Sequence, residues 1–508
     1  MRERRVVTVG ETTISLGEIV AIARGEAQVA LDESPAYKAR VEASRRVLQT
    51  AARGEAVYGV TTGFGRSCDV PVAGDLIARL PENLVRFHGC GVGPLFSDEE
   101  SAAIVAVRLV SLARGYSGVR PQLLEGLCGL VNRRVLPRIP TQGSVGASGD
   151  LTPLSYVAAV LMGEREVSYD GRTLPAAEAL AAAGIPRLRF EPKETLAIMN
   201  GTSAMTGLAC LVIEAAQRLC RLAAAITAMT VEAVRGNGAH FDERIFALKP
   251  HPGQVEAARW IREDLGYTPG AAGAGVRVQD RYSLRCAPHV IGVALDTLTF
   301  ARNLVEIEIN GVNDNPIADP ESGRVLMGGN FYGGHVCMAM DALKTAMASV
   351  ADLIDRQLIL LCDPTANGGL PLDLVAATGE ARTANFGFKA MQILTSALAA
   401  EALKLTMPAA AFSRSTEGHN QDKVSMGTIA ARDCATIVGL CETVAIVHLL
   451  AACQALDLRG GKGHSLRLFQ AVRAEVPMVV EDRAMEGDIA RMLARWRAGE
   501  LPVGGDAR

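Results

Sequence analysis

The stretch TIVGLCETVAIVHLLAACQAL, residues 436–456, decides the fold class. Its side chains are apolar almost throughout, but Glu442 and His448 interrupt the run within the length that a membrane-spanning helix needs. Ionisable side chains inside such a run favour a core helix of a bundle over a membrane span. We therefore expect a packed helical core and no membrane partner.

Similar apolar segments extend outward from this stretch. Apolar residues recur at helical spacing from residue 202 to about 239, from about 282 to 361, from 383 to 405 and from about 424 to 456. Hydrophobic residues make up 49% of the chain and aromatic residues only 4%, which favours closely packed helices over a β-sandwich. The predicted fold class is mainly α, with a long antiparallel central helical bundle.

The first 200 residues have a different pattern, in which short segments alternate with glycine-rich turns such as YGVTTGFG at 58–65 and GSVGASGD at 143–150. A chain of 508 residues is too long for one simple core. We predict a mixed N-terminal domain over residues 1–200, which carries the catalytic loops, and a central bundle with C-terminal helices over residues 201–508.

Charge and cysteine content exclude several classes of function. The net charge is −3 with acidic and basic residues interspersed, so nothing indicates a nucleic-acid partner or an anionic membrane surface. The N-terminus has charges but no apolar region after them, which predicts a cytoplasmic protein. Eleven cysteines without paired spacing predict reduced, buried thiols, and no metal site is expected. A small soluble substrate fits best, and the broad apolar helix surfaces predict an oligomer.

The segment GSVGASGDLTPL, residues 143–154, carries the most chemical information. Its glycines permit a turn in which the backbone nitrogen of Gly149 approaches the carbonyl carbon of Ala147. Closure of that five-membered ring, with loss of water from the ring and from Ser148, leaves an exocyclic methylidene group on an imidazolone. Such a group is a strong electrophile that no ordinary side chain supplies. Taken alone, a turn of this composition is more often only a turn or a phosphate-binding loop.

The whole segment resembles the prosthetic-group signature of the aromatic amino acid ammonia-lyase and aminomutase family. The resemblance implies that Ala147, Ser148 and Gly149 form 4-methylideneimidazol-5-one autocatalytically, with no external cofactor. The length of the chain resembles the compact bacterial form. For that form the resemblance implies a homotetramer whose active sites draw on three subunits, so that the loop of Tyr58 meets a pocket built largely from neighbouring chains.

Three further positions resemble residues with roles in this family. Tyr58 matches the general base that removes the β-proton, and Asn200 matches the asparagine that hydrogen-bonds the carbonyl of the prosthetic group or the substrate. Arg285 matches the ligand of the substrate α-carboxylate, which a guanidinium can bind with two parallel hydrogen bonds. The ordinary alternatives are a packed aromatic, a helix cap and a solvated arginine.

Other predicted pocket residues accompany these three. Gln279, Tyr282 and Arg285 follow one another at intervals of three residues, which places them on one helical face or turn, and the resemblance puts Tyr282 among the catalytic residues. Phe331 and the NDNP segment at 313–316 also match family positions near the active site, although core packing and turn chemistry explain them equally well.

Two places bear on the choice of amino acid. Histidine-specific members have a glutamate where this chain has Gln421, so a protonated imidazole lacks its carboxylate partner. At Phe87 and His88 the chain has a hybrid of the family's pairs, in which Phe87 would pack on the substrate ring and His88 would hydrogen-bond a phenolic hydroxyl. These residues together predict tyrosine as the substrate, ahead of phenylalanine.

The expected activity is therefore elimination of ammonia from tyrosine or phenylalanine, giving coumarate or cinnamate. A 2,3-aminomutase uses the same residues and returns the amine to the β-carbon, so the sequence leaves it open. A histidine lyase giving urocanate is the third alternative. A helical scaffold without catalysis is the alternative from another class, but the intact catalytic positions argue against it.

Overall fold

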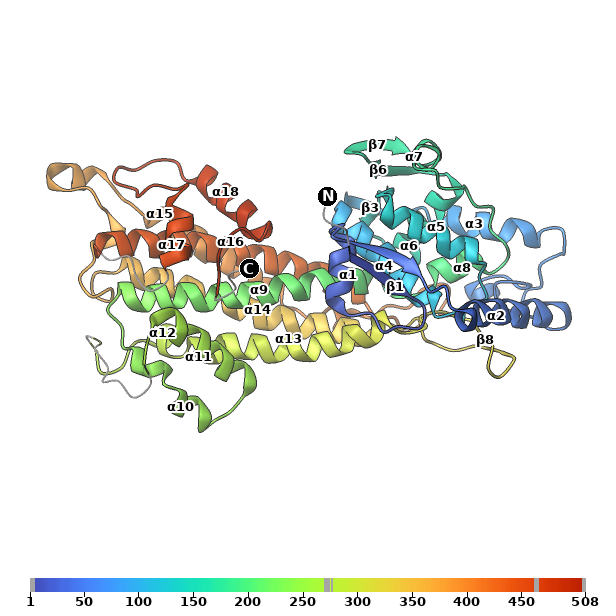
Figure 1. Cartoon of the computed structure of the whole chain (residues 1–508), viewed down its shortest axis with the longest axis horizontal. Coiled ribbons are helices and arrows are strands. Elements are labelled where there is room, and N and C mark those ends of the chain that lie inside the picture. The colour runs from blue at the N-terminus through green and yellow to red at the C-terminus, as the bar shows by residue number, and fades with distance from the viewer. Residues whose placement is uncertain (1–4, 269–274, 276, 461–465, 505–508) are drawn as a thin grey trace. The chain divides into compact units, whose positions relative to one another are not determined.

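The computed structural model describes residues 5–268, 275, 277–460 and 466–504. The chain is mostly helical, as predicted, and its few strands are short (Figure 1). It divides into two compact units that are discontinuous in sequence. Unit 1 comprises Met1–Glu214, Ala301–Asp341 and Pro408–Arg432, and unit 2 comprises Ala215–Phe300, Ala342–Met407 and Asp433–Arg508. The boundary near residue 200 stays a prediction of the sequence.

Unit 1 combines short helices with four small sheets. Its helices are α1 (Leu16–Ala23), α2 (Pro35–Gly54), α3 (Leu80–Phe87), α4 (Asp98–Ala113), α5 (Pro121–Asn132), α6 (Leu151–Met162), α7 (Ala176–Ala183) and α8 (Glu194–Met199), with 3₁₀ turns at Gly65–Ser67, Ile77–Arg79 and Ala409–Phe412. Serine hydroxyls begin α1 and α4 as capping boxes, in which each serine accepts from the backbone of a glutamate three residues on.

The strands of unit 1 are β1 (Arg5–Val9), β2 (Ala27–Leu31), β3 (Val92–Leu95), β4 (Leu136–Pro137), β5 (Pro140–Gln142), β6 (Glu166–Tyr169), β7 (Arg172–Pro175), β8 (Ile317–Asp319) and β9 (Arg324–Leu326). β1 and β2 pair in parallel with Arg5 opposite Ala27, and the other sheets are antiparallel in the orders β3-β5, β4-β6-β7 and β8-β9. β5 leads directly into the glycine-rich loop at 143–150, which ends where α6 begins.

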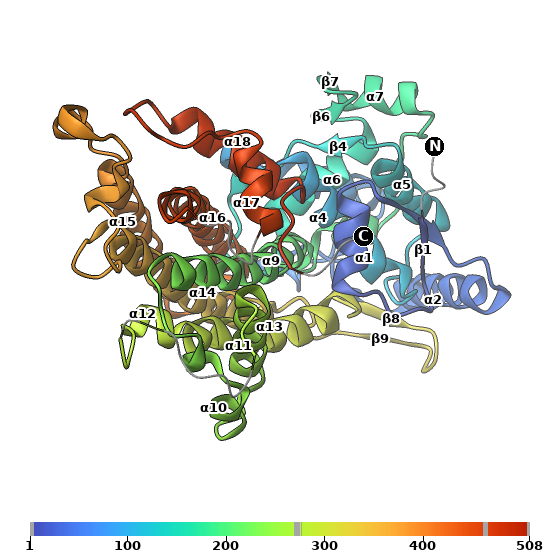
Figure 2. The ribbon, with the colours of Figure 1, turned by 60° about the vertical axis from the view of Figure 1, so that its left-hand side comes forward.

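Four long helices have residues in both units: α9 (Ser203–Ala233), α13 (Ala287–Ile309), α14 (Gly334–Cys362) and α16 (Gly427–Leu458). The remaining elements of unit 2 are α10 (Glu243–Ala247), α11 (Pro252–Leu265), α12 (Tyr282–Arg285), α15 (Lys389–Lys404), α17 (Leu466–Arg473) and α18 (Glu486–Arg497), with 3₁₀ turns at Gly238–Phe241, Leu372–Leu374 and Gly379–Ala384. Within unit 2 the long helices lie side by side (Figures 1 and 2).

The polar interruptions of residues 436–456 each have a hydrogen-bond partner inside unit 2, although the buried Nδ1 of His448 has none. His448 is fully buried on α16, where its Nε2 lies 2.7 Å from Thr230 Oγ1 of α9, and burial lowers the pKa of this histidine to about 3. Glu442 accepts from Trp496 Nε1 at 3.0 Å and from Arg497 Nε at 2.8 Å. In the part of the chain that the structure describes, α16 alone is long and apolar enough to span a membrane, yet 72% of its apolar window is buried. It is a core helix, as predicted.

Candidate active site

The loop before α6 turns sharply at the tripeptide that the sequence singles out. Gly146, Ser148 and Gly149 have positive φ angles of 79°, 49° and 80°. A serine in this left-handed region is uncommon and costs of order 1–3 kcal/mol, so the surrounding contacts must hold it there. Strain of this kind concentrates at functional sites, and here it falls on the residue whose hydroxyl would leave during ring formation.

The residue after this turn is fixed against the backbone of Gly201. Gly149 and Gly201 form a parallel β-bridge, in which Gly201 N donates to Ser148 O at 3.1 Å and Asp150 N donates to Gly201 O at 2.8 Å. A methyl group built at Gly149 would overlap the Gly201 carbonyl. Glycine is therefore the residue that this close approach admits, and the carbonyl of Ser148 has a backbone donor aimed at it.

Asp150 holds the same loop through hydrogen bonds to its carboxylate. Its carboxylate is fully buried and accepts from Met205 N and Ser144 Oγ, each at 2.9 Å, and from Thr428 Oγ1. Burial raises the pKa of this carboxyl, and the hydrogen bonds that it accepts oppose the rise. These bonds connect the loop with the beginnings of α9 and α16 and so hold the strained turn in place.

A cavity of about 330 Å³ in unit 1 lies over this tripeptide. Its lining includes six residues predicted from the sequence, Tyr58, Ala147, Ser148, Asn200, Phe331 and Gln421. Five segments far apart in the sequence thus meet within one chain. Tyr58 therefore lines the same cavity as the tripeptide of its own chain, and the contribution of neighbouring chains to this pocket stays a prediction.

The tripeptide fits the proposed prosthetic group in three respects. Ala147 and Ser148 line the cavity, Gly149 stands where a side chain is excluded, and the carbonyl oxygen of Ser148 already accepts a hydrogen bond. No cluster of three or more histidine, cysteine or acidic side chains suited to a metal ion occurs among the residues that the structure describes.

Tyr58 is one of two tyrosines in the cavity lining, with Tyr332 the other. Its hydroxyl oxygen accepts from Gly65 N at 2.9 Å, and a methyl group at Gly65 would overlap the carboxylate of Glu417. The Glu417 carboxylate therefore packs against Gly65, the residue whose backbone nitrogen donates to the Tyr58 hydroxyl. Burial raises the pKa of Tyr58, the hydrogen bond from Gly65 lowers it, and the charge of Glu417 raises it further. A phenolate with a raised pKa is a strong base once it forms.

Asn200 closes α8 and lines the cavity. Its Nδ2 donates to Asn315 O at 2.7 Å, whereas its buried Oδ1 has no hydrogen-bond partner. A buried acceptor without a donor costs about 1–3 kcal/mol, which a ligand with an N–H group would recover. In this structure the donor to the Ser148 carbonyl is the backbone nitrogen of Gly201, and the predicted role of Asn200 toward the prosthetic group or the substrate stays a prediction.

Phe87 and His88 lie at the end of α3 and outside the lining of this cavity. Phe87 is 57% exposed, so it packs on no ring in the described structure other than that of His88, whose centroid is 4.1 Å away. His88 Nδ1 lies 3.0 Å from Leu84 O, and burial lowers the pKa of this histidine. The imidazole is thus held by its own helix.

Gln279, Tyr282 and Arg285 belong to unit 2 and do not appear in the lining of the unit 1 cavity. Tyr282 and Arg285 are together on α12, with the guanidinium carbon 4.6 Å from the centre of the tyrosine ring. Arg285 Nε donates to Asp280 O at 3.0 Å, and Tyr282 is 72% exposed. Their roles toward a substrate stay predictions.

The cavity also contains residues that the sequence did not single out. Asn420 and Lys423 flank the Gln421 position, so the motif around that position was a usable signal. Cys68 follows the Tyr58 loop and shows no pattern that points to the cavity. Asn315 belongs to the NDNP segment that the sequence did single out, and it lines the cavity and accepts from Asn200 Nδ2; the role of that segment toward a substrate stays a prediction.

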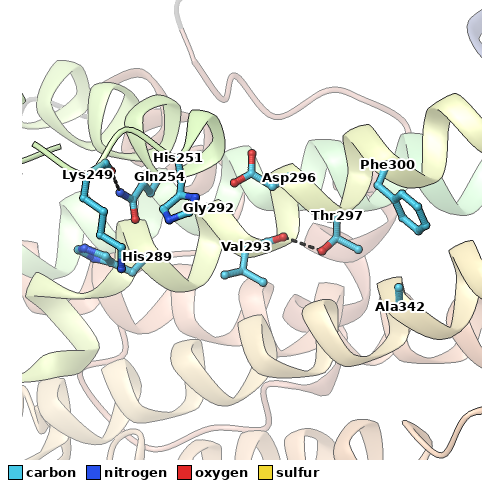
Figure 3. A pocket seen from close by; sticks show the side chains of 10 residues that line it. All are labelled: Lys249, His251, Gln254, His289, Gly292, Val293, Asp296, Thr297, Phe300 and Ala342. Carbon is cyan, nitrogen blue, oxygen red and sulfur yellow. Dashed lines mark hydrogen bonds between the residues drawn. The ribbon is translucent and has the colours of Figure 1, made fainter. Parts of the chain in front are cut away.

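A second cavity, of about 420 Å³, lies in unit 2 beside α11 and α13 (Figure 3). Lys249, His251 and His289 give it a basic edge, and Val293 and Phe300 an apolar one. Asp296 accepts from Gly253 N at 2.8 Å and so serves the beginning of α11. This cavity contains none of the predicted site residues, and the unit 1 cavity is therefore the candidate active site.

Curated relatives match the chain along nearly its whole length. A histidine ammonia-lyase of Gloeobacter violaceus is 40% identical over 497 residues, which cover 96% of this chain and 95% of the relative. A histidine ammonia-lyase of Aromatoleum aromaticum is also 40% identical, over 96% of this chain and 92% of the relative.

These relatives overturn the substrate prediction. The preference for tyrosine or phenylalanine inferred from Phe87, His88 and Gln421 is wrong, because full-length relatives at this identity are histidine ammonia-lyases. The prediction relied on Phe87 as a wall of the pocket, but that side chain is exposed outside the cavity. It also treated the missing charge at Gln421 as a bar to imidazole, although an amide can hydrogen-bond the neutral ring.

Solved structures and a family model agree on the wider assignment. A histidine ammonia-lyase of Trypanosoma cruzi matches with a TM-score of 0.88 and 30% identity over 97% of this chain and 94% of that one. A tyrosine aminomutase of Streptomyces globisporus matches with a TM-score of 0.90 and 35% identity over 97% of both chains. The model of the aromatic amino acid lyases matches residues 14–476. The chain therefore belongs to the aromatic amino acid lyase family and is an ammonia-lyase-type carbon–nitrogen lyase.

Proposed function

We propose that this chain is a histidine ammonia-lyase, which eliminates ammonia from L-histidine in the cytoplasm and releases urocanate. The observation that carries the proposal is the full-length similarity to histidine ammonia-lyases at up to 40% identity. The unit 1 cavity supports it, since the cavity combines the Ala147-Ser148 backbone with a tyrosine hydroxyl and an unpaired amide oxygen.

Each residue of the cavity has a separate role in the elimination. The 4-methylideneimidazol-5-one derived from Ala147, Ser148 and Gly149 supplies an electrophile that makes the amino group a better leaving group. Tyr58 accepts the β-proton of the substrate. The unpaired Oδ1 of Asn200 accepts a hydrogen bond from the substrate's ammonium group.

Gln421 is suited to a neutral imidazole. Its Oε1 accepts from Thr416 Oγ1 at 2.7 Å, inside a tight hairpin closed by the backbone bridge between these two residues. We infer that this bond orients the side-chain amide of Gln421, which lines the cavity, so that its nitrogen is the donor available to a substrate. A neutral imidazole offers one ring nitrogen as the matching acceptor, whereas a protonated imidazole offers none.

Histidine binding should therefore weaken as the pH falls through the imidazole pKa of about 6.5. The KM for histidine should rise in acid for the wild type, and Gln421→Glu should remove that rise, because a carboxylate accepts from the imidazolium. Steady-state KM values measured across this pH range test the idea, with the exposed Gln122→Glu on α5 as a matched change of charge. If the KM for histidine rose equally in acid for the wild type and Gln421→Glu, another residue would have to bind the imidazole ring.

The pH dependence of turnover tests Tyr58 separately. Because the charge of Glu417 raises the pKa of Tyr58, Glu417→Gln lowers that pKa and exposes the phenolate at lower pH. The alkaline rise in kcat/KM should move toward neutral pH by a fraction of a unit. Glu321→Gln is the control, since Glu321 accepts from the hydroxyl of the half-buried Tyr116. If the alkaline rise in kcat/KM stayed at the same pH in both variants, a group other than Tyr58 would act as the base.

The substrate assay tests the proposed function itself. Purified protein is incubated separately with L-histidine, L-tyrosine and L-phenylalanine, and the products are followed by ultraviolet absorbance and chromatography. We expect urocanate and ammonia from histidine. The kcat/KM for histidine should be at least about a hundredfold above that for tyrosine or phenylalanine, because a site built to hydrogen-bond one substrate rejects analogues that lack the bonding group. A β-amino acid as the main product, or preferential turnover of tyrosine, would refute the proposal.

We further propose a homotetramer in which Arg285 of a second chain completes each cavity and binds the α-carboxylate. Chains carrying Tyr58→Phe and chains carrying Arg285→Lys, each inactive alone, should then regain activity when coexpressed, since some cavities receive both intact residues. Coexpressed Tyr58→Phe and Ser148→Ala chains are the control and should stay inactive, because both residues line one chain's cavity. Activity of the control pair, or none in the test pair, would contradict shared sites.

A further inference from the structure

Arg108, on α4, is a buried charge that the elimination chemistry does not use. Its side chain is fully buried, and burial lowers its pKa to about 10, so the guanidinium remains protonated at neutral pH. It donates to Asn313 O at 3.0 Å and to Asn200 O at 3.3 Å. Burying a cation is costly, the charges of Asp314 and Asp150 offset that cost only in part, and a role beyond packing would explain its presence.

The guanidinium lies directly on the peptide bond that joins Asn200 to Gly201. A methyl group built at Gly201 would overlap Arg108 Nη1, so the guanidinium packs against the glycine itself. The carbonyl of this peptide accepts from Arg108, and its N–H, on Gly201, donates to Ser148 O at 3.1 Å. One peptide group therefore connects the cation with the carbonyl oxygen of Ser148.

A hydrogen bond to one end of a peptide polarises the other end. When a cation binds the carbonyl oxygen, electron density moves toward that oxygen and the N–H becomes a stronger donor. The effect is largest where water is absent, and here Arg108, Asn200 and Gly201 are all buried. The donor aimed at Ser148 O thus acts as a charge-assisted donor although it is a backbone amide.

We propose that Arg108 is a positioning residue for Ser148, which polarises the Asn200–Gly201 peptide and so stabilises negative charge on the Ser148 carbonyl oxygen. This inference rests on the proposed function, since it assumes that the tripeptide forms the prosthetic group. The residue acts during formation of that group and touches neither substrate nor reacting atom.

The charge arises when Ser148 loses its hydroxyl. The Cα–H bond breaks, its electron pair forms the Cα=Cβ double bond, and the Cβ–O bond breaks, so that proton and hydroxide leave as water. As the proton departs, the electron pair is shared with the adjacent carbonyl, and its oxygen becomes negative. Gly201 N–H is already aimed at this oxygen, as oxyanion donors are in enzymes.

The experiment follows this water loss directly in the full-length protein. Protein made in a short pulse is sampled over time, and intact mass gives the fractions that have lost no water, one water and two waters. Arg108→Gln, which keeps a donor but not the charge, should reach the form that lacks both waters about tenfold more slowly than wild type. Arg108→Lys should be about threefold slower, because lysine keeps the charge but loses the planar fork.

The control is Arg120→Gln, which breaks a half-buried ion pair with Glu194 of α8, 2.6 Å long, without touching the Asn200–Gly201 peptide. A purely structural role predicts that variants of both arginines lower the melting temperature and mature alike. Our proposal predicts that Arg120→Gln lowers the melting temperature and still matures at the wild-type rate. If Arg108→Gln is insoluble, Arg108→Lys decides the question by the same mass readout.

If the folded Arg108 variants reached the form that lacks both waters at the wild-type rate, this inference would be overturned and the proposed function would stand. A wild-type chain that turns over histidine but never loses two waters would instead overturn the proposed prosthetic group. The two failures are therefore distinguishable in one set of spectra.

Discussion

Tyr58→Phe is expected to lower kcat/KM for histidine by about 10²–10⁴-fold, the usual contribution of a general base, while the chain still loses two waters. The substitution keeps the aromatic ring and removes the hydroxyl oxygen, which is both the basic group and the acceptor of the hydrogen bond from Gly65 N. Steady-state kinetics and intact mass are measured on the same preparation.

The matched control is Tyr116→Phe, which removes an exposed hydroxyl 2.9 Å from Glu321 in the same unit. It should keep wild-type kinetics. If Tyr58→Phe also kept them, the β-proton would have to leave to another group of the cavity, and Lys423 would be the first candidate because it lines the same space.

Gly149→Ala is expected to abolish activity, because the tripeptide can no longer reach the conformation that ring closure requires. The added methyl group would overlap the Gly201 carbonyl, and the φ angle of 80° disfavours any side chain. The bridge that aims Gly201 N at Ser148 O would open as well. Intact mass should show a chain that has lost no water.

Gly171→Ala is the control that separates the backbone strain of a positive φ angle from the overlap with the Gly201 carbonyl. Gly171 has a similar φ of 70°, but a methyl group there meets nothing within 4 Å. This variant should lose about 1 kcal/mol of stability and keep both water loss and activity. Two lost waters in Gly149→Ala would show that the Gly149–Gly201 contact is not required for ring formation.

Much of the fold and the central motif could be predicted from sequence because their signals are local. Helical spacing in residues 436–456 required a core helix, and the structure supplies partners for both polar interruptions, Thr230 for His448 and Trp496 for Glu442. The glycines of 143–150 predicted a turn, and Gly146 and Gly149 adopt the positive φ angles that such a turn needs.

The rest depends on contacts between segments that no local pattern encodes. Gly201 follows a residue singled out for its side chain, yet its backbone nitrogen is the group that reaches Ser148. Arg108 lies in an apolar helix and gives no motif, so its link to the same peptide emerges only from the folded chain. The substrate prediction failed for a related reason, since the exposure of Phe87 and the hydrogen bond that Gln421 receives from Thr416 are tertiary properties.

Intact-mass analysis of the purified wild-type chain tests the central claim most directly, namely that the unit 1 cavity holds an electrophile made from Ala147, Ser148 and Gly149. The account predicts a mass lower by two waters than the encoded sequence, with the loss confined to the peptide that contains residues 147–149. In Ser148→Ala at least the water from the serine should be retained. A wild-type chain of unmodified mass that still converts histidine to urocanate would contradict the account.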